Sequence, residues 1–513
     1  MAHKNIHSIY DLIKKAQSEK GDKVFILNQA DERKITYNEF FNDVNAAYRY
    51  FSSLEIKSGD KIAVISESSY LGYVFITAAL SFGITISPLS TSLKENDLDY
   101  ALSLICPRVV FVSRECKKKM SYIDKFSNKY TFITMDEQCS LGKGLTETGE
   151  LNEISADGSI IIFTTGSTGR SKGVELTVQN ILANIYDVVR YYGISDDSRL
   201  IAYFPLTTIG STVINILSTA YAGASVFLCK PFLEQSLFLA FVKDFWNIIQ
   251  NNKISHIYAN PSVLNMLLKF QKSFKTLTWK PKMIISSMAP LSKETQNAVE
   301  DLTGIPVLNG YGLTETTCRS LFGSYDDEKR RKCSLGKPIY PTKIINEAGN
   351  ECKPYEVGEI LISGPTVMKG YYNDSASTGN VIKDGWFYTG DLGYYDEEHD
   401  FYIVGRKKNI IIKHGNKISI EEVEEALLGY KKMYDFAVVG VPDENMGEKV
   451  VLFCVEYENE PIDQNELVKF CKDNLSEYKC PDLIKTVKAI PRSASGKILR
   501  EELKKLLISE EKN

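Results

Sequence analysis

Short runs of β-branched residues, each bounded by turn residues, recur along the first two-thirds of the chain. Between many of these runs the apolar residues follow a helical spacing, as over residues 180–192 and 293–302. Strands that alternate with amphipathic helices predict a mostly parallel α/β core. The predicted strands span residues 62–66, 109–112, 160–164, 225–228, 256–258, 283–286 and 307–308.

The pattern changes after Pro338. Strands become shorter and are separated by glycines, as at residues 359–363 and 401–404. This alternation is typical of antiparallel strands joined by tight turns. We therefore predict an antiparallel β unit that follows the α/β core within one large domain, residues 1–406.

A second, smaller domain is predicted over residues 407–513. Its boundary falls where a glycine is followed by basic residues, at residues 405–409. Ser419 and Glu422 have capping-box spacing and predict a helix that runs to Leu428. The pattern then predicts two strands and one more helix, over residues 435–441, 450–457 and 464–474, which together give an α+β domain.

The length and composition narrow the class of protein. A chain of 513 residues is too long for one ordinary core, so two or more packed units are expected. Apolar residues make up 43% and charged residues 25%, which excludes disorder, collagen-like repeats and a coiled-coil rod. The formal net charge is −4, so the chain has no overall field that would attract a nucleic acid. Any anion that this protein binds must therefore be held at a local site.

The cysteines and the absence of targeting features predict a cytoplasmic protein. The ten cysteines form no Cys-x-x-Cys pair, and the first residues lack the apolar core of a signal peptide. We therefore expect reduced thiols. The most apolar stretch, residues 213–229, is interrupted by polar residues and is too short for a transmembrane segment. The five histidines show no metal-ligand spacing, so no structural zinc site is predicted.

The strongest local signal for chemistry is a loop rich in hydrogen-bond donors that directly follows the predicted strand. Its sequence is Thr164-Thr-Gly-Ser-Thr-Gly-Arg-Ser-Lys-Gly173. The glycines let backbone N–H groups face an anion, three hydroxyls add donors, and Lys172 adds positive charge. The loop lacks the Gly-Lys-Ser/Thr of a Walker A motif. A solvated turn is the alternative, but so many donors after a strand favour a phosphate-binding loop.

Two further motifs could serve a nucleotide. In Asn309-Gly-Tyr-Gly-Leu-Thr-Glu315 the glycines allow flat approach of a ring, Tyr311 offers a stacking face and Glu315 could hold Mg²⁺ near phosphates. Asp391 follows a tight turn and suits a ribose diol. Each motif has an equally good structural alternative, a strand-end turn with a core tyrosine and a capping aspartate. Lys497, taken alone, is more readily a solvated surface lysine.

The whole set of motifs, in this order, resembles the adenylate-forming superfamily, which includes acyl- and aryl-CoA synthetases, firefly luciferase and the adenylation domains of peptide synthetases. The resemblance extends from Ile35 to Lys497 and rests on the Thr/Ser/Gly loop, Tyr-Gly-Leu-Thr-Glu, Thr-Gly-Asp, Gly-Arg and Gly-Lys. It implies a large N-terminal domain and a small C-terminal lid joined at a hinge. It also implies ATP, Mg²⁺ and CoA, or the phosphopantetheine of an acyl carrier protein, as the molecules bound.

The resemblance also implies roles for single residues. Asp391 and Arg406 match the positions that hold the ribose, and Glu315 matches the Mg²⁺ position. Lys408 matches the hinge, and His414 and Gly415 lie on the loop expected to face pantetheine. The expected catalytic residues are Lys497, Glu315, Thr164 and Lys172, with Lys497 touching both the carboxylate and the α-phosphate. The residues expected to bind ATP are Thr164, Thr165, Gly166, Ser167, Thr168, Gly169, Lys172, Met288, Ala289, Pro290, Asn309, Gly310, Tyr311, Gly312, Thr314, Asp391, Arg406 and Lys497.

Departures from the commonest family pattern bear on the acid substrate. Thr208 stands where many acyl- and aryl-CoA ligases have a gating histidine. Phe204 stands where amino-acid-activating relatives keep an aspartate, so α-amino acids are disfavoured because a buried ammonium needs a counter-ion. The acyl pocket expected from Phe204, Thr208, Ile209 and Ser287 is therefore uncharged. We expect a medium- or long-chain fatty acid as the first choice of substrate and an aryl or cinnamic-type acid as the second.

Three hypotheses for the activity follow. The first is an ATP-dependent ligase that converts a carboxylic acid to acyl-AMP and then to acyl-CoA. This chemistry needs positive charge at the phosphorus and the leaving pyrophosphate, but no protein nucleophile. The second is a stand-alone adenylating enzyme that loads the acyl group onto a carrier protein. The third, a non-catalytic acyl or nucleotide sensor, is disfavoured because Lys497, Glu315 and Asp391 are all present.

Overall fold

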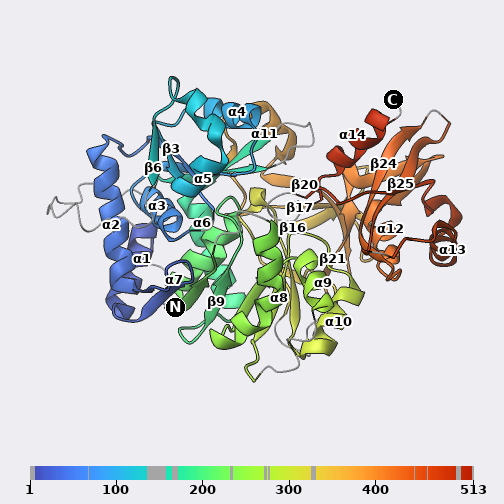
Figure 1. The fold of residues 1–513 in the computed structure, drawn as a ribbon, viewed down its shortest axis with the longest axis horizontal. Helices are drawn as coiled ribbons and strands as arrows, with labels where there is room; N and C mark the ends of the chain where they lie inside the picture. Colours follow the sequence, from blue (N-terminus) through green and yellow to red (C-terminus); the bar gives the residue numbers. More distant parts are fainter. Residues whose placement is uncertain are drawn as a thin grey trace.

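The computed structural model of the chain combines three sheets and their helices in a large N-terminal part with a small C-terminal unit (Figure 1). The small unit lies at one side of the molecule, beyond the antiparallel sheet that carries β20 and β21. The structure describes residues 6–67, 69–135, 157–164, 171–230, 235–270, 274, 278–324, 331–443, 445–458, 460–492 and 498–510.

A nine-stranded sheet forms one layer of the large part. Six of its strands, from β13 to β1 in the spatial order, run parallel, and the strands at both edges are antiparallel to their neighbours. The parallel strands place their carboxyl ends at a common edge. The order is β15 (Lys337–Pro338), β14 (Leu321–Phe322), β13 (Val307–Tyr311), β12 (Met283–Ser286), β11 (His256–Ala259), β9 (Arg199–Ala202), β10 (Ser225–Leu228), β1 (Val24–Asn28) and β2 (Lys34–Thr36).

A seven-stranded sheet forms the second layer. Its strands β7 and β8 make an antiparallel hairpin that ends at the pair Thr164 and Lys172. The predicted phosphate loop is therefore the connection of this hairpin, and its residues 165–170 lie outside the described ranges. The order is β18 (Gly370–Tyr371), β8 (Lys172–Thr177), β7 (Ser159–Thr164), β4 (Thr85–Leu89), β3 (Lys61–Ile65), β5 (Val109–Ser113) and β6 (Phe132–Met135).

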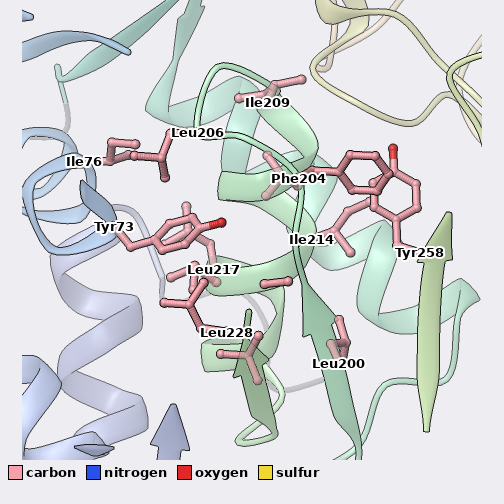
Figure 2. Packing of buried hydrophobic residues seen from close by; sticks show 14 of the residues in the cluster. Tyr73, Ile76, Leu200, Phe204, Leu206, Ile209, Ile214, Leu217, Leu228 and Tyr258 are labelled. Carbon is pink, nitrogen blue, oxygen red and sulfur yellow. The ribbon is translucent and has the colours of Figure 1, made fainter. Parts of the chain in front are cut away.

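Helices join the two sheets into one core. Every residue of α3 (Tyr70–Ser81) is buried, which is typical of a helix enclosed on all sides. It contacts β4 on one side and the π-helix η3 (Ser211–Ser218), a neighbour of β9, on the other. Figure 2 shows Tyr73 and Ile76 of α3 beside Leu206 and Leu217, which come from the segment between β9 and β10. The predicted alternation of strands and helices is thus confirmed.

The remaining helices of the large part lie on the outer faces or connect the sheets. The predicted helices at residues 180–192 and 293–302 are confirmed as α6 and α10. The most apolar stretch, residues 213–229, is folded into η3, α7 and β10 and is almost wholly buried. Among the described helices, none is both long and apolar enough to cross a bilayer. The bounds are α1 (Ile9–Lys20), α2 (Tyr37–Ser53), α4 (Glu95–Ile105), α5 (Arg114–Lys119), α6 (Val178–Tyr191), α7 (Thr219–Tyr221), α8 (Gln235–Asn251), α9 (Pro261–Lys269), α10 (Lys293–Thr303) and α11 (Ser375–Val381).

The change of pattern after Pro338 corresponds to a five-stranded antiparallel sheet, as predicted. Its centre is the long strand β20, which pairs with β17, β19 and β21. Within this sheet the register sets Asp391 directly opposite Arg406. The strands are β16 (Thr342–Ile345), β17 (Gly358–Ile362), β19 (Ile382–Lys383), β20 (Trp386–Tyr395) and β21 (Phe401–Arg406).

The C-terminal unit has hydrophobic clusters of its own, formed by residues from Ile411 onward. The predicted helix start is confirmed, because Ser419 Oγ accepts a hydrogen bond from Glu422 N at the start of α12. A separate core is typical of a domain that folds as its own unit. The elements are β22 (Ile410–Lys413), β23 (Asn416–Ser419), α12 (Ile420–Leu427), β24 (Met433–Asp443), β25 (Gly447–Glu456), α13 (Gln464–Asn474), β26 (Leu483–Thr486) and α14 (Arg500–Glu510).

The two parts contact one another through a few polar side chains. Lys269 Nζ donates to the Tyr434 carbonyl oxygen at 2.7 Å and lies 4.3 Å from the centre of the Tyr434 ring. Arg492 Nη1 lies 3.3 Å from Ser262 Oγ, at the start of α9. The large and small parts agree with the fold that the resemblance implies. The boundary at residues 406 and 407 stays a prediction, next to the end of β21.

Candidate active site

The carboxyl ends of β12 and β13 bring two of the predicted motifs to the same edge. Ser286 pairs with Asn309 in the parallel register, so the segments that follow these strands leave the sheet side by side. Met288 has a left-handed φ of 72°, which turns the chain sharply after β12 and leaves Ala289 and Pro290 exposed. Asn309 is buried, and its Nδ2 donates to the Cys333 carbonyl oxygen at 3.3 Å.

A buried carboxylate forms the centre of the site. Tyr311 donates its hydroxyl to Asp391 Oδ2 at 2.7 Å, and Arg406 Nε lies 2.6 Å from Asp391 Oδ1. The Asp391 side chain is 0% exposed, so the ion pair with Arg406 is what makes its burial tolerable. Burial and the neighbouring carboxylate raise the pKa of Tyr311, which keeps its hydroxyl a donor. The structure thus brings together three residues that the sequence predicted in separate motifs.

A second cluster connects the tip of the β7–β8 hairpin to Glu315. Glu315 lies in the short turn η5 (Thr314–Thr316), and its Oε1 accepts the hydroxyl of Tyr371 at 3.1 Å. Lys172, which pairs with Thr164 across the hairpin, places its Nζ 4.8 Å from the centre of the same tyrosine ring. Burial, together with Glu315, raises the pKa of Tyr371. Tyr371 is not among the residues predicted from the sequence, because its position depends on the pairing of β18 with β8.

The predicted hinge residue lies beside these carboxylates. Lys408 belongs to the short turn η6 (Lys407–Asn409) directly after β21. Burial lowers the pKa of Lys408 and the charge of Arg406 lowers it further, while Asp391 and Glu315 oppose both. The charges of both carboxylates therefore act on the ammonium group of Lys408.

The segment that contains Lys497 is bracketed by residues near the same edge. Arg492 and Ile498 form a backbone bridge, so the two flanks of residues 493–497 lie together. The contact of Arg492 with Ser262 places these flanks at the start of α9, just after β11. Lys497 itself, like Thr165, Gly166, Ser167, Thr168 and Gly169, lies outside the described residues.

The residues expected to face pantetheine lie apart from this cluster. His414 and Gly415 form the exposed turn between β22 and β23. The backbone N–H of His414 donates to the Met446 carbonyl oxygen at 2.8 Å. Lys417, in the same hairpin, pairs with Glu347 of the turn between β16 and β17.

The segment expected to bind the acid is largely buried. The Phe204 ring lies 5.2 Å from the Tyr258 ring, and Figure 2 shows the two side chains facing one another. Ile209 is also buried, and the Ser287 backbone N–H donates to the Ala259 carbonyl oxygen at 3.2 Å. Thr208 uses its hydroxyl within its own turn, where Oγ1 donates to the Pro205 carbonyl oxygen at 2.8 Å.

The structure adds one charged residue that the sequence analysis did not name. Arg319 is buried next to this segment, and its guanidinium carbon lies 4.9 Å from the centre of the Tyr258 ring. Its Nε lies 3.0 Å from the Tyr192 hydroxyl, and Nη1 donates to the Cys318 carbonyl oxygen at 2.9 Å. The expectation of an uncharged pocket rested on other segments. The sequence offered one sign of a buried charge near the pocket, namely an arginine between the Glu315 motif and the apolar residues of β14.

The fold and the order of its motifs define an adenylate-forming enzyme of the acyl- or aryl-CoA synthetase type. The chain belongs to the AMP-binding enzyme family, which it matches over residues 13–372, and residues 422–497 match the AMP-binding enzyme C-terminal domain.

Several CoA ligases are similar in sequence to this chain over almost the full length of both proteins. The oxalate–CoA ligase of Arabidopsis thaliana is 28% identical, over 89% of this chain and 90% of that one. The long-chain-fatty-acid–CoA ligase of Bacillus subtilis is 29% identical, over 92% and 90%. A solved structure of o-succinylbenzoate CoA synthetase from Bacillus subtilis, in complex with its acyl-adenylate intermediate, is 25% identical with a TM-score of 0.81, over 96% and 97%.

Proposed function

We propose that this protein is an AMP-forming ligase that activates a carboxylic acid with ATP and transfers the acyl group to CoA. The observation that carries the proposal is the buried carboxylate of Asp391, which is held by Tyr311 and Arg406. This arrangement offers acceptors for a ribose diol, and Glu315, in the turn that follows the strand of Tyr311, offers a carboxylate for phosphate-bound Mg²⁺. The names of the relatives, which are CoA ligases, support CoA over a carrier protein as the acceptor.

The nucleotide roles follow from the chemistry of the side chains. Each Asp391 oxygen has a second lone pair, so it can accept a ribose hydroxyl while it keeps Tyr311 and Arg406. Mg²⁺ in nucleotide enzymes is held by one or two carboxylates together with phosphates and water, and the half-buried Glu315 in the turn η5 fits this requirement. When bound, the ion neutralises charge on the phosphates.

Two bond exchanges make up the reaction. A carboxylate oxygen of the acid attacks the α-phosphorus of ATP, and the bond to pyrophosphate breaks. Lys172 and Lys497 supply positive charge for the leaving pyrophosphate and for the α-phosphate. The CoA thiol then loses its proton to solvent, the resulting thiolate attacks the acyl carbon, and the bond to AMP breaks so that AMP leaves with the electron pair.

The identity of the acid is the finer part of the proposal. The relative that acts on long-chain fatty acids supports the first choice made from the sequence, and an aryl acid remains the second. The names of the other two proteins denote acids with two carboxylates.

The free thiols of the nine described cysteines support the expectation of a reducing compartment such as the cytoplasm.

Acid-dependent exchange of pyrophosphate into ATP tests the first half-reaction. We expect Lys497→Ala to slow the exchange by roughly 10²–10³, since one preorganised charge at the reacting phosphate is lost. Lys488→Ala, at an exposed lysine of the same unit, is the matched control and should exchange at the normal rate. CoA and a phosphopantetheinylated carrier protein, offered separately after acyl-AMP has formed, identify the acceptor. Unchanged exchange in Lys497→Ala would contradict the role given to that lysine.

A further inference from the structure

The side chain of Arg319 is a buried cation without an acidic partner in the described part of the chain. It is 1% exposed. Its described contacts are the Tyr192 hydroxyl, the Cys318 carbonyl oxygen and the face of the Tyr258 ring. The remaining nitrogen, Nη2, makes no hydrogen bond of acceptable geometry within the described residues, although the Tyr258 side chain lies close enough to interact.

The neighbours of Arg319 do not neutralise its charge. Burial raises the pKa of Tyr192 to about 12, and it also raises the pKa of Tyr258 and of the Cys318 thiol. All three groups are therefore neutral at physiological pH, whereas a guanidinium stays protonated. A buried charge that lacks a counter-ion is costly, and the cost is removed when an anion binds to it.

Arg319 lies near two predicted segments, one expected to bind ATP and one expected to bind the acid. On one side, a Cβ placed on Gly310 would be 2.9 Å from Arg319 Nε. On the other side, a Cβ on Gly210 would lie 3.2 Å from Tyr258 and 3.6 Å from the Cys318 sulfur. Gly210 ends the segment that begins at Phe204. The guanidinium is thus close to one segment expected to bind ATP, and the residues that it contacts adjoin the segment expected to bind the acid.

Polar atoms in the flanking elements are also without described partners. The hydroxyls of Ser286, at the end of β12, and Ser320, next to Arg319, are buried and make no hydrogen bond within the described residues. The same holds for the Thr212 hydroxyl and the side-chain amide of Asn215, both in η3 directly after Gly210. Buried polar atoms normally have a partner in the protein, water or a ligand. A hydrocarbon tail would supply none.

We propose that Arg319 binds a second carboxylate of the acid substrate, so that the substrate class is the dicarboxylic acids rather than the fatty acids. This inference rests on the proposed function and specifies its substrate. A guanidinium matches the planar geometry of a carboxylate, and Nη2 offers the donor that the protein leaves available. The reacting carboxylate goes to the phosphate, and the other pairs with Arg319. A simple fatty acid would leave the buried charge unpaired.

Matched pairs of acids test this inference with the complete protein. Pyrophosphate exchange is measured with malonate and propionate, succinate and butyrate, phthalate and benzoate, and with octanoate. We expect at least one diacid to exceed its matched monoacid by about 10- to 100-fold in kcat/KM, the range for a hydrogen bond to a charged group. Equal use of the matched acids, or a clear preference for octanoate, would overturn the inference and leave the proposed ligase activity intact.

Variants separate a role in binding from a role in packing. Arg319→Gln should abolish the preference for the diacid but change kcat/KM for the monoacid only a few-fold, and Arg319→Lys should retain part of the preference. Arg190→Gln, at an exposed position of α6, is the control. If Arg319→Gln lowers kcat/KM equally for the diacid and the monoacid, Arg319 is a packing residue. If Arg319→Gln fails to fold, the same conclusion follows when Arg319→Lys keeps the full diacid preference of the native protein.

Thermal stabilisation by the diacid alone gives a readout that does not need activity. A diacid that raises the melting temperature of the native protein, while its matched monoacid does not and the increase is smaller in Arg319→Lys, supports the inference. If this increase occurs but no acid supports exchange, the proposed function is wrong while the binding site for a dicarboxylate stands.

Discussion

Asp391 shows how a single buried charge depends on its neighbours. The carboxylate is shielded from water, yet the hydroxyl of Tyr311 and the guanidinium of Arg406 both reach it. Charge-assisted hydrogen bonds of this kind are roughly twice as strong as neutral ones. The same two oxygens are the acceptors that we assign to the ribose.

Asp391→Asn should weaken ATP binding. The substitution keeps the size of the side chain but removes the negative charge that Arg406 and the ribose hydroxyls require. We expect the KM for ATP in pyrophosphate exchange to rise about tenfold or more, which corresponds to loss of one hydrogen bond to a charged group. Asp384→Asn, at an exposed turn of the same sheet, serves as the control. An unaltered KM in Asp391→Asn would show that this carboxylate does not contact the nucleotide.

The buried His256 should make the free energy of unfolding depend on pH. Its ring lies 2.8 Å from the Ser255 hydroxyl and 3.0 Å from the Tyr192 carbonyl oxygen, and burial lowers its pKa to about 4. An unfolded histidine has a pKa near ~6.5, so the unfolded chain binds the proton more tightly. The contribution to stability is therefore complete above about pH 6.5 and is lost as the pH falls towards 4, by roughly 2–3 kcal/mol.

Urea unfolding of the native protein and of His256→Gln between pH 7 and 4 measures this effect. The glutamine can still hydrogen-bond but does not titrate, so its stability should fall less steeply over this range. Parallel curves for the two proteins would rule out His256 as the titrating group.

The turn between β13 and β14 is the element that positions Glu315 and Arg319 together. Gly312 begins this turn, and a Cβ placed on it would lie 2.1 Å from the Cys318 carbonyl oxygen. The glycine is thus needed for the close approach of two backbone segments, a reason that differs from the flat approach of a ring inferred from the sequence. The turn carries an expected ligand of Mg²⁺ on one side and the buried cation on the other.

Gly312→Ala should disturb both residues at once. Because the contact is with backbone atoms, the turn itself must move, and we expect a lower melting temperature together with at least a tenfold loss of pyrophosphate exchange. Gly379→Ala, in α11, is the control, since its Cβ would meet nothing within 4 Å and alanine favours a helix. A normal melting temperature in Gly312→Ala would mean that the turn accommodates a side chain.

At the scale of the whole molecule, the small C-terminal unit carries groups that we assign to different steps. In this structure the flanks of residues 493–497 face the start of α9, whereas the turn of His414 and Gly415 is exposed elsewhere. One orientation of a rigid unit cannot bring both to the same acyl group. We therefore expect the unit to rotate about Lys408 between adenylation and thioester formation.

Lys408→Pro should separate the two half-reactions. Proline fixes φ near ~−65°, so one orientation of the lid should be lost. Acyl-adenylate and pyrophosphate should still form, while transfer to CoA becomes at least tenfold slower in single-turnover assays. Lys408→Ala is the matched control, because it also removes the ammonium group near Asp391 and Glu315 but leaves the backbone free. Equal losses in both steps of Lys408→Pro would place the hinge elsewhere.

The sequence by itself determined the local elements and the family. The runs at residues 160–164, 256–258 and 283–286 became β7, β11 and β12, and the capping residue Ser419 does begin a helix. These features depend on neighbouring residues, through the two-residue repeat of strands, the spacing of helices and the chemistry of caps. The order of motifs was likewise readable without any contact between them.

Only the tertiary structure decided which side chains meet. Tyr311 reaches Asp391 across 80 positions of the sequence, and Arg319 reaches Tyr192 across 127. Tyr371 meets Glu315 because β18 pairs with β8, and Arg319 is buried in contact with residues of α6 and β11 that are distant in the sequence. Register and burial depend on contacts between distant segments, so no local pattern indicates them. The charge beside the expected acyl pocket, on which the choice of substrate now rests, could therefore be recognised only in the folded chain.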